Sequence, residues 1–167
     1  MSLAWASPEP VETSALKDGD RWSVGVPAEV DLVGLAWGLH PEALYRPFRE
    51  DGGFHLRAAA GVMVGREVTL VSPLAVGVRH EFFPTKRVQP SVGTGLQWQS
   101  FVVYEDKVHH RVDMYMETNL HVRVHEDYDV GLQMSPEFGF LGFGGGGTYA
   151  TFGLGMAVRL NVQYNGF

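Results

Sequence analysis

Apolar and polar residues alternate along most of the chain after residue 20. In the clearest stretch, residues 112–124, every second residue is apolar or threonine. Side chains of a β-strand point alternately to two faces, so one face of this stretch would be apolar and the other polar. A helix would scatter both sets around its surface. The alternation therefore predicts long β-strands with one apolar and one polar face.

The same alternation recurs often enough to predict about eight strands. Two of them, read at 22–32 and 35–47, contain Pro27 and Pro41, which cannot donate a backbone hydrogen bond in a sheet. The other strands are read near residues 54–62, 70–78, 92–102, 112–124, 128–138 and 150–164. Short turn-like segments separate the strands, and short connections join antiparallel neighbours. The expected fold is all-β: an antiparallel, up-and-down, closed β-barrel of about eight strands.

The length of 167 residues suits one domain, and we place the β-barrel domain at residues 21–167. Residues 1–20 contain prolines and show no periodicity, which predicts a flexible N-terminal tail. Within this tail, Ala4-Trp5-Ala6 has the small-x-small pattern that ends a secretory signal. The tail is therefore interpreted either as the remnant of a signal peptide or as a plain extension.

Composition and charge exclude several classes of protein. The formal net charge of −6 argues against a nucleic-acid partner, because phosphate binding depends on clustered Lys and Arg. The absence of Cys excludes disulfides and thiolate metal sites. No apolar run approaches the roughly 20 residues that a membrane-spanning helix needs. Any contact with a membrane must therefore be made by strands or by the protein surface.

The alternation alone fits two barrels that differ in which face lies inside. A soluble barrel buries its apolar residues, whereas a membrane barrel turns them toward lipid. The polar face favours the transmembrane type, because it carries Arg among small residues, and Lys17, Lys86 and Lys107 are all expected off the strands. The alternative is a soluble barrel that binds a hydrophobic ligand. Its cavity would be lined by Met114, Leu120, Phe152 and Leu154, with Arg123 in water.

Two further features accompany the alternating strands. Residues 87–96 read R-V-Q-P-S-V-G-T-G-L, and the sequence ends at Phe167. The first resembles the R-x-x-P-x-x-G-x-G entry to a strand in small bacterial outer-membrane β-barrels, and the chain as a whole resembles barrels of the OmpA/OmpX type. This resemblance implies residence in the bacterial outer membrane, contact with membrane lipid, and an assembly machinery that reads Phe167 as its signal.

A transmembrane barrel of this size would hold its polar face in a narrow lumen. Arg and carboxylate side chains removed from bulk water need partners, so they are expected to neutralise one another there. The predicted polar network of the lumen comprises Arg57, Arg79, Asp113, Tyr115, Glu117, His121, Arg123, Glu137 and Arg159. Such a network predicts a largely plugged lumen, at most a narrow pore, and a structural or interaction role without catalytic residues, metal or cofactor.

One compact group of histidines raises the alternative of a metal site. His109 and His110 are adjacent, and adjacent strand residues point to opposite faces, so the two could share an ion only in a bent loop. Such a loop would also have to bring in Asp106. The sequence leaves this loop site open without favouring it.

An enzymatic alternative also follows from the resemblance, because some small outer-membrane barrels modify the acyl chains of lipid A with a Ser, a His and an acid. No His in the chain is followed by Ser two residues later. Ser135 and Glu137 are nevertheless expected on the same lumen face as His121 and Asp113. A catalytic triad is therefore geometrically possible, but no sequence motif supports it.

Overall fold

The computed structural model describes residues 21–32, 35–48, 53–65, 68–84, 86–103, 107–144, 147–149 and 153–165. The predictions for the N-terminal tail, the signal remnant and the assembly signal Phe167 lie outside the described residues. The described residues form twelve strand segments. They are β1 (Trp22–Gly25), β2 (Ala28–Asp31), β3 (Ala36–Leu39), β4 (Glu42–Tyr45), β5 (Phe54–Ala60), β6 (Val62–Gly65), β7 (Val68–Glu81), β8 (Val88–Val103), β9 (Lys107–His125), β10 (Tyr128–Gly144), β11 (Gly147–Tyr149) and β12 (Gly153–Tyr164).

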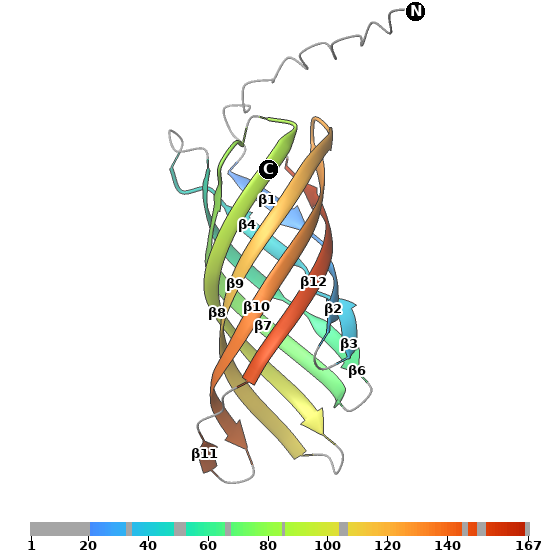
Figure 1. Ribbon diagram of the computed structural model, residues 1–167, viewed down its shortest axis with the longest axis vertical. Coiled ribbons are helices and arrows are strands. Elements are labelled where there is room, and N and C mark those ends of the chain that lie inside the picture. The colour runs from blue at the N-terminus through green and yellow to red at the C-terminus, as the bar shows by residue number, and fades with distance from the viewer. Residues whose placement is uncertain are drawn as a thin grey trace, which may run out of the picture.

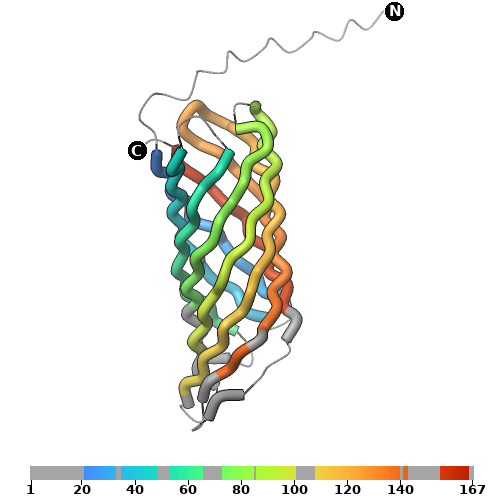
Figure 2. Tube along the Cα trace, turned by 90° about the vertical axis from the view of Figure 1, so that its left-hand side faces the viewer, coloured from blue at the N-terminus to red at the C-terminus, as the bar shows by residue number. Residues whose placement is uncertain are grey.

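The segments form one closed barrel of eight antiparallel strands (Figure 1). Four barrel strands each consist of two segments in line: β1 with β2, β3 with β4, β5 with β6, and β11 with β12. Neighbours in sequence are neighbours in space, and β12 closes the cylinder by pairing with β1 and β2. Both ends of the described chain lie at one end of the barrel, here called the terminal end (Figure 2). The predicted fold class is confirmed.

Each of the two proline-containing barrel strands is interrupted at its proline. Pro27 separates β1 from β2, and Pro41 separates β3 from β4, because proline has no N–H to donate to the ladder. The sheet still holds across these breaks, since His40 N donates to Pro27 O at 2.9 Å and Ala60 N donates to Pro41 O at 3.0 Å. The prediction of one barrel strand at 22–32 and one at 35–47 agrees with the structure, in which each strand consists of two segments separated by its proline. Lys107, expected off the strands, is the first residue of β9.

The apolar face of the barrel points outward and the polar face points inward. On β10, Leu132 is 48% exposed while the adjacent Gln133 is 0% exposed. Most of the buried side chains are polar or charged, and most of the exposed large side chains are apolar. This arrangement excludes the soluble barrel with an apolar cavity, because Met114 and Leu120 are exposed on the outer face. The side chains of Phe152 and Leu154 lie outside what the structure describes.

The outer apolar band has the height of a bilayer core. On β10 it runs from Tyr128 to Phe138, and the ten residue steps between them span about 33 Å along an extended strand. A strand tilt of about 40° reduces this length to roughly 25 Å along the barrel axis, the usual height of the apolar band of such barrels. Within the described residues, no helix is long and apolar enough to span a membrane.

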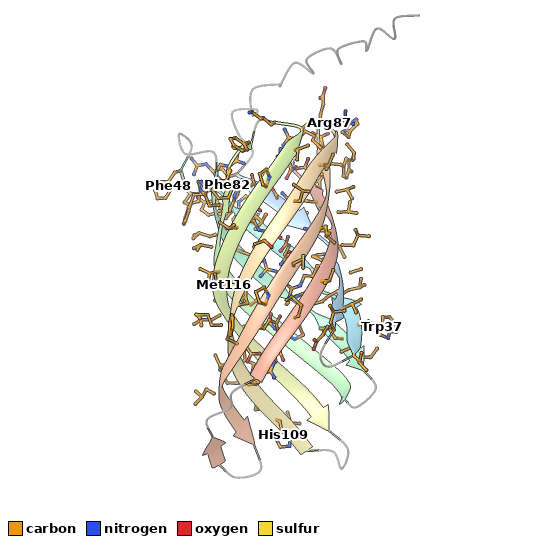
Figure 3. The ribbon with its side chains drawn as sticks, viewed as in Figure 1. Trp37, Phe48, Phe82, Arg87, His109 and Met116 are labelled. Carbon is orange, nitrogen blue, oxygen red and sulfur yellow. The ribbon has the colours of Figure 1, made fainter. Side chains whose placement is uncertain are left out.

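Aromatic side chains gather at the terminal end of the band. Trp22 packs against Tyr45 with ring centroids 4.7 Å apart, and Tyr128 packs against Tyr164 at 5.1 Å. Phe48 and Phe82 lie at the same end, and Trp37 lies lower on the barrel wall (Figure 3). Aromatic rings at this level suit the headgroup region of a bilayer, where one side of the ring is apolar and the other is wet.

Candidate functional site in the barrel lumen

Four buried charged side chains meet inside the barrel and form what we call the central quartet. They are Glu42 on β4, Arg57 on β5, Arg79 on β7 and Glu117 on β9. Arg79 Nε donates to Glu117 Oε1 at 2.7 Å, and its two terminal nitrogens donate to the Glu42 carboxylate at 3.1 and 3.0 Å. Arg57 Nε donates to Glu42 Oε2 at 2.7 Å. Each carboxylate is therefore within ion-pair distance of an arginine.

The quartet is electrically balanced and withdrawn from water. Two guanidinium groups face two carboxylates, and all four side chains have 0% exposure. A single charge left in such an environment is costly, whereas arginine and carboxylate satisfy each other through charge-assisted hydrogen bonds. Arg79 is the centre of the group, because it donates three hydrogen bonds to the two carboxylates, whereas Arg57 donates one to Glu42 and lies 3.6 Å from Glu117.

Neutral polar side chains extend the quartet to further strands. Arg57 donates from Nη1 to the hydroxyl of Tyr115 on β9 at 3.1 Å. Gln133 on β10 donates to Glu117 at 2.8 Å, and Asn161 on β12 donates to Glu42 at 2.8 Å. Side chains from six of the twelve segments, β4, β5, β7, β9, β10 and β12, thus meet in one hydrogen-bonded group.

Glycine makes room for the large side chains of the lumen. A Cβ atom at Gly77 would lie 2.3 Å from the Tyr115 hydroxyl, and one at Gly95 would lie 2.6 Å from the same atom. Neither distance is compatible with a real contact, so Tyr115 occupies space that these two positions leave open. The mixture of small and large residues on the polar face is therefore a packing requirement of the narrow interior.

A second charged cluster lies farther from the terminal end. Arg159 on β12 donates to both oxygens of Glu29 on β2, at 2.8 and 3.0 Å, and its Nη2 lies 3.5 Å from Glu137 on β10. The Nδ1 atom of His40 is hydrogen-bonded to Glu29 Oε2 at 2.7 Å. Arg111 pairs with Asp113 beside this cluster, with 2.7 Å between Arg111 Nε and Asp113 Oδ1.

Glu29 and His40 are buried in this cluster but are not among the lumen residues predicted from the sequence. The alternation of buried and exposed residues continues unbroken through Pro27, so Glu29 shares the inward parity of Gly25. It also continues through Pro41, so that His40 and Glu42 face the same way. Extending the alternation across each proline would have found both residues.

The nine predicted lumen residues fall into separate groups. The quartet and its immediate partner account for Arg57, Arg79, Tyr115 and Glu117, while Glu137 and Arg159 belong to the second cluster and Asp113 pairs with Arg111. His121 is buried at 3% exposure. Arg123 lies at the terminal end with 24% side-chain exposure, where its Nε donates to Asp129 at 3.1 Å.

The described residues do not support the alternative of a metal site. His109 and His110 lie on β9 rather than in a bent loop, and Asp106 lies outside the described residues. The Nδ1 atom of His110 is hydrogen-bonded instead to Ser100 Oγ on β8, at 2.9 Å. Across the part of the chain that the structure describes, no group of three His, Asp or Glu side chains is placed to hold a metal ion.

The residues of the enzymatic alternative are not brought together. Ser135 Oγ donates to the backbone oxygen of Met116 at 3.0 Å, so its proton is already engaged. His121 is paired in the sheet with Gly131, four residues from Ser135. Four residues of extended strand cover about 13 Å, which is too far for proton transfer between Ser135 and His121.

The fold has clear counterparts among solved structures. The N-terminal β-barrel domain of Pseudomonas aeruginosa OprF is 12% identical, with a TM-score of 0.66 over 88% of this chain and 98% of that one. OprG, an outer-membrane protein of the same organism, is 7% identical, with a TM-score of 0.61 over 87% and 95%. Neisserial surface protein A is 12% identical, with a TM-score of 0.60 over 87% and 95%.

The similarity rests on structure rather than on sequence. No family model matches the chain, and no curated protein sequence matches it. At identities this low, shared geometry establishes the fold and leaves the specific role open. The chain is a closed, eight-stranded, antiparallel β-barrel with the architecture of the small outer-membrane barrels.

Proposed function

We propose that this protein resides in a bacterial outer membrane as a barrel with a closed lumen, and that its role is structural or in interaction rather than in transport. The outward apolar band and the aromatic rings at its terminal end support insertion into a bilayer. The likeness to barrels that are outer-membrane proteins supports the choice of membrane. A strand protein can cross a bilayer only as a closed cylinder, which this chain forms.

The observation that carries the closed lumen is the bridge made by Arg79. Around the barrel the order is β4, β5, β7, β8, β9, so β4 and β9 are four strands apart in an eight-stranded cylinder and form opposite walls. Arg79 binds Glu42 on one wall and Glu117 on the other. An ion passing this level would have to break buried, charge-assisted hydrogen bonds.

Electrical recordings in planar lipid bilayers test the closed lumen. The wild-type protein should show little current, because the quartet fills the cross-section of the lumen. The double variant Glu42→Ser/Arg79→Ser removes one charge of each sign and much side-chain volume, so its conductance should rise severalfold. The outward substitution Val76→Ser, on the same strand as Arg79, should leave the current unchanged. Equal currents from the wild type and the double variant would contradict a plug at this level.

Cell fractionation tests the location. Expressed with a cleavable secretion signal in a Gram-negative host, the protein should appear in the outer-membrane pellet and migrate faster on a gel before boiling than after it, because a folded barrel resists detergent. Recovery of folded protein from the soluble fraction without detergent would overturn the proposal.

A further inference from the structure

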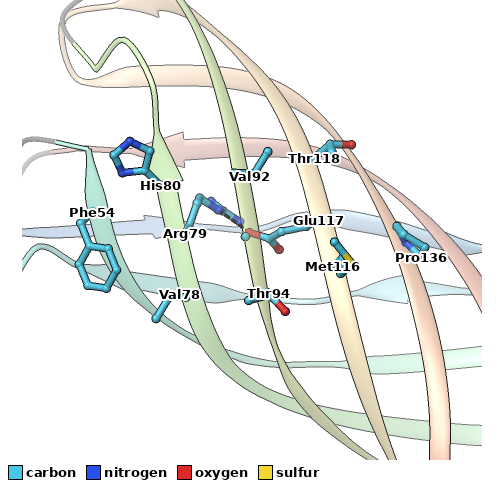
Figure 4. Close-up of a pocket in the computed structure, with 11 residues that line it drawn as sticks. Phe54, Val78, Arg79, His80, Val92, Thr94, Met116, Glu117, Thr118 and Pro136 are labelled. Carbon is cyan, nitrogen blue, oxygen red and sulfur yellow. Dashed lines mark hydrogen bonds and ion pairs between the residues drawn. The ribbon is translucent and has the colours of Figure 1, made fainter.

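The outer wall of the barrel contains an apolar groove of about 410 Å³. Among the residues that line it are Phe54, His80, Val92, Thr94, Met116 and Thr118 (Figure 4). The sheet register explains its shape. Phe54, His80, Val92 and Thr118 are paired across β5, β7, β8 and β9, and Val78, Thr94 and Met116 are paired in the adjacent row. The short Val and Thr side chains form the floor between larger neighbours.

The groove lies in the part of the wall that faces lipid under the proposed function. Val92 is 42% exposed and Met116 is 52% exposed on the outer surface. Toward the terminal end, the ring of His80 meets the ring of Phe82 edge-on at 5.3 Å. Figure 3 places Met116 and Phe82 on the same side of the barrel, with Phe82 nearer the terminal end. The groove thus leads toward the level of the aromatic rings.

Two cations lie beyond Phe82 and Phe83, past the terminal end of the groove. Lys86 and Arg87 are exposed in the turn between β7 and β8, and they define what we call the basic rim. The ammonium of Lys86 lies 4.7 Å above the ring of Phe83. Phe82 and Phe83 follow the end of β7, and the ring of Phe82 is 5.3 Å from that of His80 in the groove. The basic rim is therefore within the reach of one lipid molecule from the groove.

The backbone of the basic rim is fixed by neighbouring strands. Gln89 donates from its side chain to Lys86 O at 3.0 Å, and Arg123 N on β9 donates to Arg87 O at 2.8 Å. A fixed turn loses little conformational entropy when it binds a ligand. Glu126 is in the turn that follows β9, three residues after Arg123 and on the side away from the groove.

From this geometry we propose that the face formed by the groove and the basic rim binds one anionic phospholipid, with an acyl chain in the groove and the phosphate on Lys86 and Arg87. The apolar floor excludes a charged occupant, while the two cations complement the negative headgroup. The proposal rests on the proposed membrane location, because the groove meets acyl chains only in a bilayer.

Native mass spectrometry of the detergent-solubilised, refolded full chain tests this site. Phosphatidylglycerol should bind one molecule per barrel at about tenfold lower concentration than phosphatidylcholine at low ionic strength, because each basic side chain near a headgroup favours the anionic lipid. The preference should weaken as salt is added. Lys86→Gln/Arg87→Gln should abolish the preference, and Thr118→Phe should weaken binding by filling the groove.

Two matched control variants distinguish a specific lipid site from a general effect of losing a cation or of enlarging an outward side chain. Arg21→Gln removes an exposed cation at the terminal end beside β1, on the opposite wall from β8, and should keep the preference. Val162→Phe enlarges an outward residue of β12 and should also keep the preference for the anionic lipid. Equal binding of both lipids by the wild type, or equal loss in Arg21→Gln and in the double variant, would overturn the proposal. Unchanged binding in Thr118→Phe would overturn the assignment of the groove.

A second copy of the chain is the competing occupant. Analytical ultracentrifugation should give a monomer mass for the wild type and for Thr118→Phe, and a wild-type dimer that this substitution abolishes would contradict lipid docking.

The gel assay for a folded barrel is run on the same samples. If no folded barrel forms in lipid or detergent, the proposed function fails, and the lipid site fails with it. A folded barrel without lipid preference removes the lipid site alone.

Discussion

Replacing Arg79 with Met should lower the free energy of unfolding by about 3–5 kcal/mol, the usual cost of removing one partner from a buried ion pair. The substitution leaves Glu42 and Glu117 with only Arg57, so the quartet gains an uncompensated negative charge inside the barrel. Methionine fills similar space but offers no donor to either carboxylate. Reversible urea unfolding in lipid vesicles, followed by tryptophan fluorescence, measures the loss.

A second substitution shows whether the cost comes from charge. In Glu42→Gln/Arg79→Met the remaining Arg57 and Glu117 are balanced again, with 3.6 Å between Arg57 Nε and Glu117 Oε2. The double variant should therefore be more stable than the sum of the two single effects predicts, with a coupling of roughly 1–3 kcal/mol. A loss below about 1 kcal/mol for Arg79→Met alone would mean that water solvates the quartet, contrary to its complete burial.

Replacing Leu132 with Arg should cost about 2–4 kcal/mol in a bilayer, because the side chain lies near the middle of the apolar band. Leu132 is close to midway between Tyr128 and Phe138 on β10 and is exposed on the outer face. The guanidinium would have to leave water for hydrocarbon without a partner. The same unfolding measurement in vesicles gives the value.

The depth of the substituted residue supplies the control. Val124 is also an exposed, outward apolar residue, but it lies at the terminal end of β9, next to the turn at residues 126–127. Val124→Arg should therefore cost only about 0–1 kcal/mol, since charge near the interface reaches water. Equal costs at the two positions would show that the outer face does not sample a bilayer.

Strand alternation predicts the direction of each side chain well, because direction depends only on parity along one strand. Leu132 faces outward and the adjacent Gln133 faces inward, as the alternation along β10 predicts. Parity says nothing about depth, however. Arg79 meets Glu42 and Glu117 because of the stagger between strands, which depends on how the barrel closes. The sequence could therefore list candidates for the lumen but could not say which of them form pairs.

Strand breaks were the harder part of the prediction for a related reason. Pro27 and Pro41 remove ladder hydrogen bonds, yet the inward parity persists across them and brings Glu29 and His40 into the lumen. In a closed barrel each strand is hydrogen-bonded to a neighbour on both edges. A missing N–H therefore interrupts the strand but does not change which side chains face the lumen. Local propensity overstates such breaks because it does not include the neighbouring strands.

The orientation of the wall is tested most directly by nuclear Overhauser contacts between lipid acyl-chain protons and leucine methyl groups in nanodiscs. Leu132 and Leu160 are outward, with 48% and 59% exposure, whereas Leu44 points into the lumen with 1% exposure. A barrel with its apolar face in lipid should give strong acyl-chain contacts for the first two methyl groups and none for Leu44. Acyl-chain contacts at Leu44, or their absence at both Leu132 and Leu160, would contradict the account.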